Sequence, residues 1–165
     1  MLLILSSADK QGSSDLPAGN SFSEVAIAWD LYQKAGYHVE ILTPQGGRAP
    51  LAYINPADDQ HLNYLYYSDF MYALNHTLSP SQVNANEYDI VQFTGGSAPI
   101  FDVPENEDIQ KIVMHVYEKN NGVIAAVCHG SAGLVNLKKS NGSYLVKGKS
   151  VCGFPDAHER KDLPH

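Results

Sequence analysis

Cysteine is scarce in this chain, which has only two among its 165 residues. Small secreted domains without a large core depend on several disulfides, so two cysteines exclude a disulfide framework of that kind. Cys152 lies in a strand-like stretch and is expected to be an inert core or sheet residue. Cys128 lies between an apolar run and a segment rich in small residues, which is a different setting.

Basic residues are also few, with 11 Lys and Arg against 18 Asp and Glu and a formal net charge of −7. They are scattered apart from short pairs such as Lys138-Lys139. Proteins that hold a phosphate backbone gather their basic residues on one surface. Nucleic acid is therefore not an expected partner.

Long apolar runs and metal-binding patterns do not occur in the sequence. The opening Met1–Leu5 is apolar, but it has no basic leader and is much too short for a signal or membrane segment. We interpret it as the first strand and expect a cytoplasmic protein without a membrane partner. The seven histidines form no pair at helical spacing around a glutamate, and no CxxC occurs, so no metal site is expected.

Apolar runs alternate with segments of helical periodicity along the chain, and 44% of the residues are hydrophobic. The expected strands are Leu2–Leu5, His38–Leu42, Ile90–Phe93 and Val123–Val127. Helices are expected around Phe22, Val25, Trp29 and Tyr32, and around Ile109, Ile112, Val113 and Val116. This alternation predicts an α/β fold in residues 1–165, a single domain with a doubly wound, mostly parallel sheet flanked by helices, as in a flavodoxin-like sandwich.

Two further segments carry structural signals. Asn63–Tyr72 is rich in aromatic residues and is predicted to be helical, packed on the sheet or on a partner subunit rather than serving as a substrate lid. Ser143–Gly153 shows two short runs around Lys147-Gly148-Lys149, which predicts a hairpin.

A nucleophile elbow is indicated where the last expected strand meets Cys128. The backbone of such a strand-to-helix turn is crowded and needs small residues two before and two after the nucleophile, where this chain has Ala126 and Gly130. The N–H groups of the following helix are expected to favour the thiolate and lower the pKa of Cys128. The alternative is a small, buried and inert cysteine at a strand end.

Glu24 is the acidic residue expected near the thiol, because it begins the first helix after the first strand. The carboxyl ends of parallel strands share one edge of the sheet, and ligands bind there. A local role is equally open, since Ser21 and Glu24 fit a capping box in which the glutamate bonds back to the backbone.

Gly95-Gly96 directly follows another expected strand, where glycines let the main chain turn tightly. The amides of Gly96 and His129 are predicted to form an oxyanion hole, with Gly95 beside the pocket. An ordinary strand-to-loop turn would show the same pair of glycines. The side chains of Cys128 and His129 are expected to diverge, so His129 would act through its amide and as a proton carrier. Glu159 is a candidate for the pocket mouth, although a solvated loop carboxylate is the commoner outcome.

Four segments, taken in order, resemble the ThiJ/PfpI superfamily, which shares the class I glutamine amidotransferase-like fold. They are residues 23–37, 43–50, 88–102 and 125–154. The pattern looks most like the branch of stress-inducible chaperones that are also glutathione-independent glyoxalases (glyoxalase III). That resemblance implies a cofactor-free Cys-Glu site with a neighbouring His, and Glu24, Cys128 and His129 occupy the matching positions.

The resemblance implies an enzyme that acts on small reactive carbonyls and converts methylglyoxal to lactate. The alternative is a stress-response chaperone or redox-sensing protein with the same fold. An amidase or peptidase is a third reading, although no separate His or Asp is spaced to complete a triad with Cys128.

The chain departs from the family pattern in two places. Relatives tend to carry paired acidic residues where this chain has Ala157–Arg160, and they usually continue beyond a position equivalent to His165 through a further strand and helix. A domain that is short at its C-terminus would expose a sheet edge, which indicates either a truncated product or cover by a partner subunit. A homodimer is therefore expected.

Overall fold

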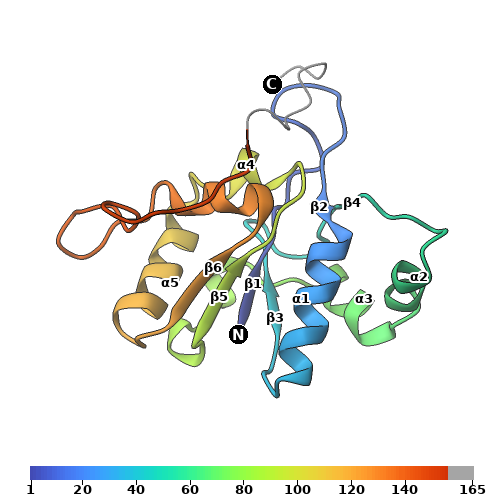
Figure 1. The fold of residues 1–165 in the computed structure, drawn as a ribbon, viewed down its shortest axis with the longest axis horizontal. Helices are drawn as coiled ribbons and strands as arrows, with labels where there is room; N and C mark the ends of the chain where they lie inside the picture. Colours follow the sequence, from blue (N-terminus) through green and yellow to red (C-terminus); the bar gives the residue numbers. More distant parts are fainter. Residues whose placement is uncertain (156–165) are drawn as a thin grey trace.

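A parallel sheet of four strands forms the centre of the computed structural model, which describes residues 1–155 (Figure 1). The strands are β1 (Leu2–Ile4), β3 (Glu40–Leu42), β5 (Ile90–Phe93) and β6 (Val123–Ala126), in the order β3-β1-β5-β6. Leu3 pairs with Ile41 on one side and with Gln92 on the other. The predicted parallel α/β sheet is confirmed, with strands at the predicted places.

Two long helices cover the sheet from opposite sides (Figure 1). The chain passes from β1 to β3 through α1 (Phe22–Lys34) and from β5 to β6 through α5 (Glu107–Glu118). The strand order therefore reverses between β1 and β5. In a doubly wound sheet, ligands bind beyond the carboxyl ends of the strands at this switch point.

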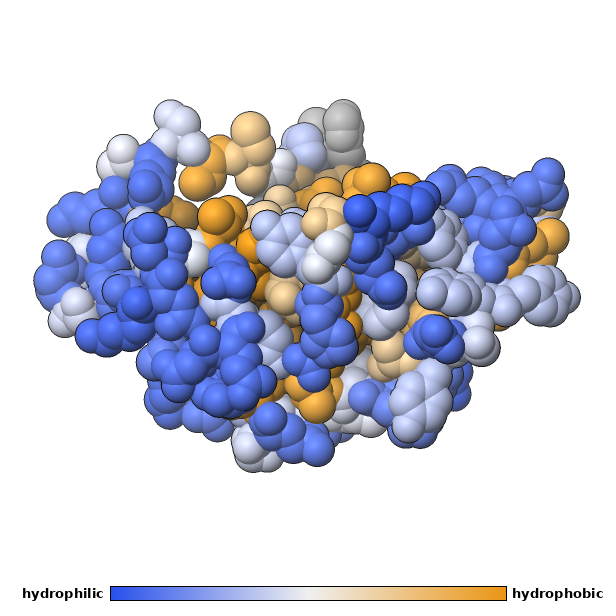
Figure 2. Space-filling model, turned by 90° about the horizontal axis from the view of Figure 1, so that it is seen from below, coloured by the Kyte–Doolittle hydropathy of each residue, from blue (hydrophilic) through white to orange (hydrophobic). Residues whose placement is uncertain are grey.

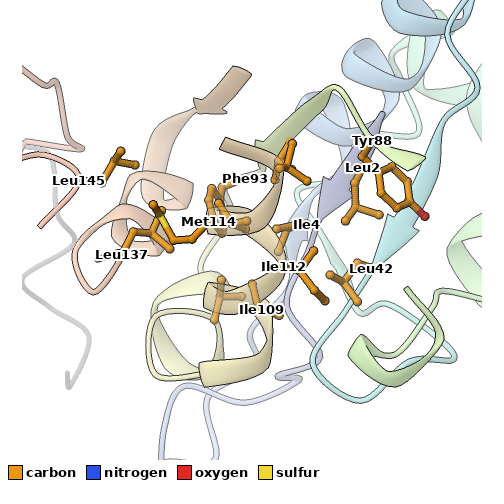
Figure 3. Close-up of a cluster of buried hydrophobic side chains, with 14 residues drawn as sticks. Leu2, Ile4, Leu42, Tyr88, Phe93, Ile109, Ile112, Met114, Leu137 and Leu145 are labelled. Atoms are coloured by element: carbon orange, nitrogen blue, oxygen red, sulfur yellow. The ribbon is translucent and has the colours of Figure 1, made fainter. Parts of the chain in front are cut away.

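Side chains alternate between the two faces of the sheet, as a pleated strand requires. Leu2, Ile4 and Phe93 belong to the cluster under α5, whereas Leu3 and Leu5 belong to the cluster under α1. Figure 3 shows side chains of β1, β3, β5 and α5 meeting in the α5 cluster. A strand with one residue inserted or deleted would exchange its two faces, so this alternation fixes the register.

The aromatic segment is helical, as predicted, but it is divided between two helices, α2 (Asp59–Leu65) and α3 (Ser68–Asn75). The Asp58 side chain caps α2 by accepting from the N–H groups of its first turn, and the chain turns at Tyr66-Tyr67. Phe70 of α3 is fully buried against Trp29 of α1, with ring centroids 5.6 Å apart. The segment thus packs against the helix that covers the sheet.

Smaller elements complete the described chain. They are β2 (Asn20–Ser21), β4 (Leu51–Ala52), α4 (Pro99–Asp102) and three 3-10 helices, η1 (Pro80–Gln82), η2 (Ala85–Glu87) and η3 (Cys128–Leu134). Strands β2 and β4 pair in parallel as a separate two-stranded sheet. No helix within residues 1–155 is long and apolar enough to cross a membrane.

The predicted hairpin over 143–153 does not form. Tyr144 makes an isolated bridge to Lys138, and the Leu145 N–H donates to the Leu137 carbonyl at 2.8 Å, so this segment turns back on the chain that precedes it. Residues 151–155 are exposed and belong to no helix or strand. Cys152 is therefore an exposed residue, and its prediction as a core or sheet residue is wrong.

Candidate active site

Cys128 lies on a strained turn between β6 and η3, with φ of +53°. A residue with a side chain is uncommon in this left-handed region. A Cβ at Gly130 would lie 2.5 Å from the Thr94 carbonyl oxygen and 2.7 Å from that of Phe93, so only glycine fits two residues after the cysteine. The geometry of a nucleophile elbow is present, followed by a 3-10 helix in place of the α-helix of the usual motif.

The Glu24 carboxylate accepts a hydrogen bond from a residue distant in the sequence and does not cap its own helix. Its Oε2 accepts from the Gly95 N–H at 2.7 Å, which joins the first turn of α1 to the loop after β5. The predicted capping box does not form, because Ser21 makes no side-chain cap and its own N–H donates to the Gly95 carbonyl at 2.9 Å. Of the two roles that the sequence left open for Glu24, the structure excludes the local one.

Gly95 fills the narrow space between Glu24 and Cys128, and Gly96 packs against the backbone of residues 19–21. A Cβ at Gly95 would lie 2.6 Å from Glu24 Oε2 and 3.1 Å from Cys128 Sγ. Gly96 has φ of +111°, and a Cβ there would lie 2.4 Å from the Gly19 carbonyl oxygen. Any side chain at either position would separate the carboxylate from the thiol or displace the loop.

Burial raises the pKa of the Cys128 thiol above its ordinary value. Glu24 acts in the same direction, through its negative charge and through the hydrogen bond that it accepts from the thiol. The N–H groups of His129 and Gly96 donate to the sulfur and oppose this shift. The predicted lowering of the pKa is wrong, because desolvation and the nearby carboxylate outweigh the two amides.

The imidazole of His129 lies beside the thiol, with Nδ1 3.5 Å from Cys128 Sγ. The expectation that these side chains diverge is therefore wrong, since the turn at Cys128 brings them together. The His129 ring also stacks on Phe154, with centroids 4.2 Å apart and an interplanar angle of 26°. Glu159, the candidate for the pocket mouth, lies outside the described residues.

Sequence reasoning gave no role to Phe154 or Ser131. Phe154 was visible only as part of the Gly-Phe pair in the resembling segment, and nothing in the pattern indicated that its ring would pack on His129. The Ser131 hydroxyl donates to the Cys128 carbonyl at 2.9 Å and supports the turn. Its signal is its position three residues after the nucleophile, where a hydroxyl can accept or donate within one helical turn.

An apolar cavity of about 690 Å³ opens next to Glu24. It runs along α1 past Ile27 and Leu31 and is bordered on the sheet side by Gln92 and Val127. The Tyr32 hydroxyl donates to Gln92 Oε1 at 2.8 Å and links α1 to β5 beside this groove. Within the described part of the chain, no group of three or more His, Cys, Asp or Glu side chains is placed to hold a metal ion.

Comparisons with known proteins identify relatives of the whole chain. The sequence model of the DJ-1/PfpI family matches residues 18–163. Glyoxalase 3 of Candida albicans is 31% identical over 166 residues, covering 96% of this chain and 70% of that protein. Glutathione-independent glyoxalase HSP31 of Saccharomyces cerevisiae is 32% identical over 166 residues, covering 96% of this chain and 69% of that protein.

Solved structures of similar proteins superpose on this chain. The X-ray structure of the Rapid Encystment Protein 24 KDa of Francisella tularensis superposes with a TM-score of 0.87 at 30% identity, covering 94% of this chain and 70% of that one. The crystal structure of glyoxalase III from Candida albicans superposes with a TM-score of 0.79 at 31% identity, covering 94% of this chain and 68% of that one.

Proposed function

Because the chain belongs to the DJ-1/PfpI family, with glutathione-independent glyoxalases among its relatives, we propose that it is a cysteine-dependent glyoxalase that converts methylglyoxal to lactate. The observation that carries the proposal is the position of Cys128 between the Glu24 carboxylate and His129 Nδ1, at a strained turn. A nucleophile within hydrogen-bond reach of two proton acceptors is the arrangement that covalent catalysis needs.

The first step is addition of Cys128 to the aldehyde carbon. The thiol loses its proton to a neighbouring acceptor, and the sulfur forms a bond with the carbonyl carbon to give a hemithioacetal. Both acceptors are close, since Glu24 Oε2 and Cys128 Sγ lie against the same side of Gly95 and His129 Nδ1 lies 3.5 Å from the sulfur. The N–H groups of Gly96 and His129 now donate to the sulfur, and they can stabilise the oxygen that becomes negative.

Proton transfers then oxidise the former aldehyde carbon and reduce the neighbouring ketone carbon. Removal of the proton from the former aldehyde carbon gives an enediol, and return of a proton to the neighbouring carbon gives a lactoyl thioester on Cys128. Water hydrolyses the thioester and releases lactate with the free thiol. Glu24 and His129 exchange these protons, and the sum of the steps is methylglyoxal plus water giving lactate.

The test is turnover of methylglyoxal by the purified chain in the absence of glutathione, with lactate as the measured product. Cys128→Ala is expected to reduce turnover to the uncatalysed background, because no other described side chain replaces the nucleophile. Cys152→Ser is the matched control and keeps full turnover under reducing conditions. Absence of lactate formation by the intact chain, shown to be folded and fully reduced, would overturn the proposal.

The open groove along α1 favours a second candidate function, that of a stress-response chaperone. Leu31 is 60% exposed there, and Ile27 and Tyr37 are also exposed on the same border. Exposed apolar patches of this kind bind unfolded chains. If holding is the main function, Leu31→Glu reduces suppression of a client's aggregation while Cys128→Ala leaves it intact, and the reverse pattern would exclude the groove.

A further inference from the structure

Cys152 is a second thiol placed beside the elbow. It lies on the exposed segment 151–155, and it lines a cavity of about 320 Å³ together with His129. His129 Nδ1 lies 3.5 Å from Cys128 Sγ. The same imidazole therefore contacts Cys128 and borders the cavity that Cys152 lines.

Two further contacts hold the Cys152 segment against the turn. Phe154 stacks on His129 with ring centroids 4.2 Å apart. A Cβ at Gly153 would lie 3.7 Å from Ser131 Oγ, and that hydroxyl donates to the Cys128 carbonyl at 2.9 Å. Gly153, the residue after Cys152, thus lies near the Ser131 side chain that supports the turn carrying Cys128.

We propose that Cys152 is the resolving thiol for Cys128, so that a peroxide converts the two cysteines into an intramolecular disulfide. Disulfide formation requires the two Cα atoms to come within about 4.4–6.8 Å of each other. The segment 151–155 is exposed and belongs to no helix or strand, so it can close over the cavity without disturbing the sheet. The proposal rests on the same reactive Cys128 as the glyoxalase proposal but does not use its substrate.

The chemistry balances with hydrogen peroxide as the oxidant. The Cys128 thiolate attacks one peroxide oxygen, the O–O bond breaks, and the sulfur is oxidised by two electrons to a sulfenic acid while the other oxygen leaves as water. The Cys152 thiolate then attacks the Cys128 sulfur, an S–S bond forms, and hydroxide leaves and takes up the remaining proton as water. The sum is two thiols and one peroxide giving one disulfide and two waters.

The consequence is reversible loss of activity under oxidative conditions. A sulfenic acid without a nearby thiol is oxidised further to sulfinic acid, which ordinary thiol reductants do not restore. With Cys152 present, the oxidised chain should regain full methylglyoxal turnover in dithiothreitol. After treatment with excess peroxide, which carries an unresolved sulfenic acid on to sulfinic acid, Cys152→Ser should stay inactive in dithiothreitol.

The experiment treats the reduced, purified chain with an equimolar amount of hydrogen peroxide, blocks remaining thiols by alkylation, and maps disulfides by mass spectrometry after proteolysis without reductant. We expect a peptide pair linked through Cys128 and Cys152, in a yield that does not depend on protein concentration. Cys152→Ser should instead show dimedone-trapped sulfenic acid at Cys128, and Cys128→Ser should leave Cys152 fully alkylatable.

Several outcomes overturn the proposal. One is a freely alkylated Cys152 beside a sulfinic Cys128 in the unmodified chain. Another is a linked pair that forms only between chains and rises with concentration. Because the readout is a linked peptide, a chain that makes the disulfide but forms no lactate supports this proposal and overturns only the glyoxalase one, and the converse result separates them equally well.

Discussion

The two faces of the sheet at β5 and β6 differ sharply in how well they are covered. On the α5 side, Val91 and Phe93 are buried among residues of α5, and Phe93 is only 1% exposed. On the α1 side, Val123 is 59% exposed, and Val127 borders the open groove. Figure 2 shows the molecule from below, with hydrophobic residues gathered toward the middle of a largely hydrophilic surface.

The closed face supports the turn at Cys128. Gly130 packs on the carbonyl groups of Phe93 and Thr94, and a Cβ at Gly133 would lie 2.5 Å from the Phe93 ring. The elbow is therefore fixed from the side that is fully packed, whereas Glu24 approaches the thiol from the side with the groove. The turn at Cys128 is thus held from the packed side, while Glu24 and Val127 line the groove on the other side.

The largest effect is expected from truncating the closed face. Phe93→Ala removes a fully buried ring and should lower the free energy of unfolding by about 3–5 kcal/mol, because the cavity left behind cannot collapse. Urea unfolding measures the change. Phe93→Leu, which keeps most of the volume, should cost much less, and equal losses for the two variants would contradict the importance of packing here.

Gly130→Ala should produce the next largest effect. Its new methyl group would meet the Thr94 carbonyl oxygen at 2.5 Å, so the turn must shift, at a cost of about 1–3 kcal/mol in stability. Lactate formation should fall further than stability alone explains, because Cys128 moves relative to Glu24. Gly153→Ala, where φ is not left-handed and the nearest atom would lie 3.7 Å away, is the control for a glycine substitution without a clash. Unchanged turnover in Gly130→Ala would show that the closed face does not fix the elbow.

Glu24 lies where the groove side meets the turn, and Glu24→Gln tests its effect on the Cys128 thiol. Glu24 raises the pKa of Cys128, so removing its charge should lower that pKa and move the pH midpoint of iodoacetamide alkylation to lower pH. Lactate formation should fall at the same time, because a proton carrier is lost. A variant whose alkylation profile matches that of the unmodified chain would show that the Glu24 carboxylate does not affect the pKa of the Cys128 thiol.

The smallest effect on stability is expected on the open face. Leu31→Ala removes a side chain that is 60% exposed, and the free energy of unfolding should change by less than about 0.5 kcal/mol. Binding of a fluorescent apolar dye should decrease, because Leu31 lines the groove. A loss comparable to that of Phe93→Ala would mean that something covers this face in solution.

The strands and the turn at Cys128 were predictable because their signals are local. Val123–Val127 is an apolar run, and small residues flank the cysteine as the turn requires. The breaks in the pattern came from tertiary contacts. The Ser21 N–H is already bonded to the Gly95 carbonyl, so Glu24 takes the distant Gly95 N–H in place of a capping position. No spacing rule reports a partner 71 residues away.

The thiol environment was predicted with the wrong sign for a related reason. A helix N-terminus can be read from sequence, but burial and an approaching carboxylate cannot, and these two raise the pKa of Cys128. The exposure of Cys152 was missed because Val151-Cys152 reads as a strand end, whereas the chain around Tyr144 bridges back to Lys138. The ring of Phe154, two residues further on, stacks on His129, and Cys152 lines a cavity together with His129.

The left-handed backbone at position 128 would be least strained if the residue had no side chain. Left-handed dihedral angles cost a residue with a Cβ roughly 1–2 kcal/mol, and glycine escapes that cost. Cys128→Gly would remove this strain only by removing the thiol as well. The strain and the sulfur therefore belong to the same residue, and neither can be kept without the other.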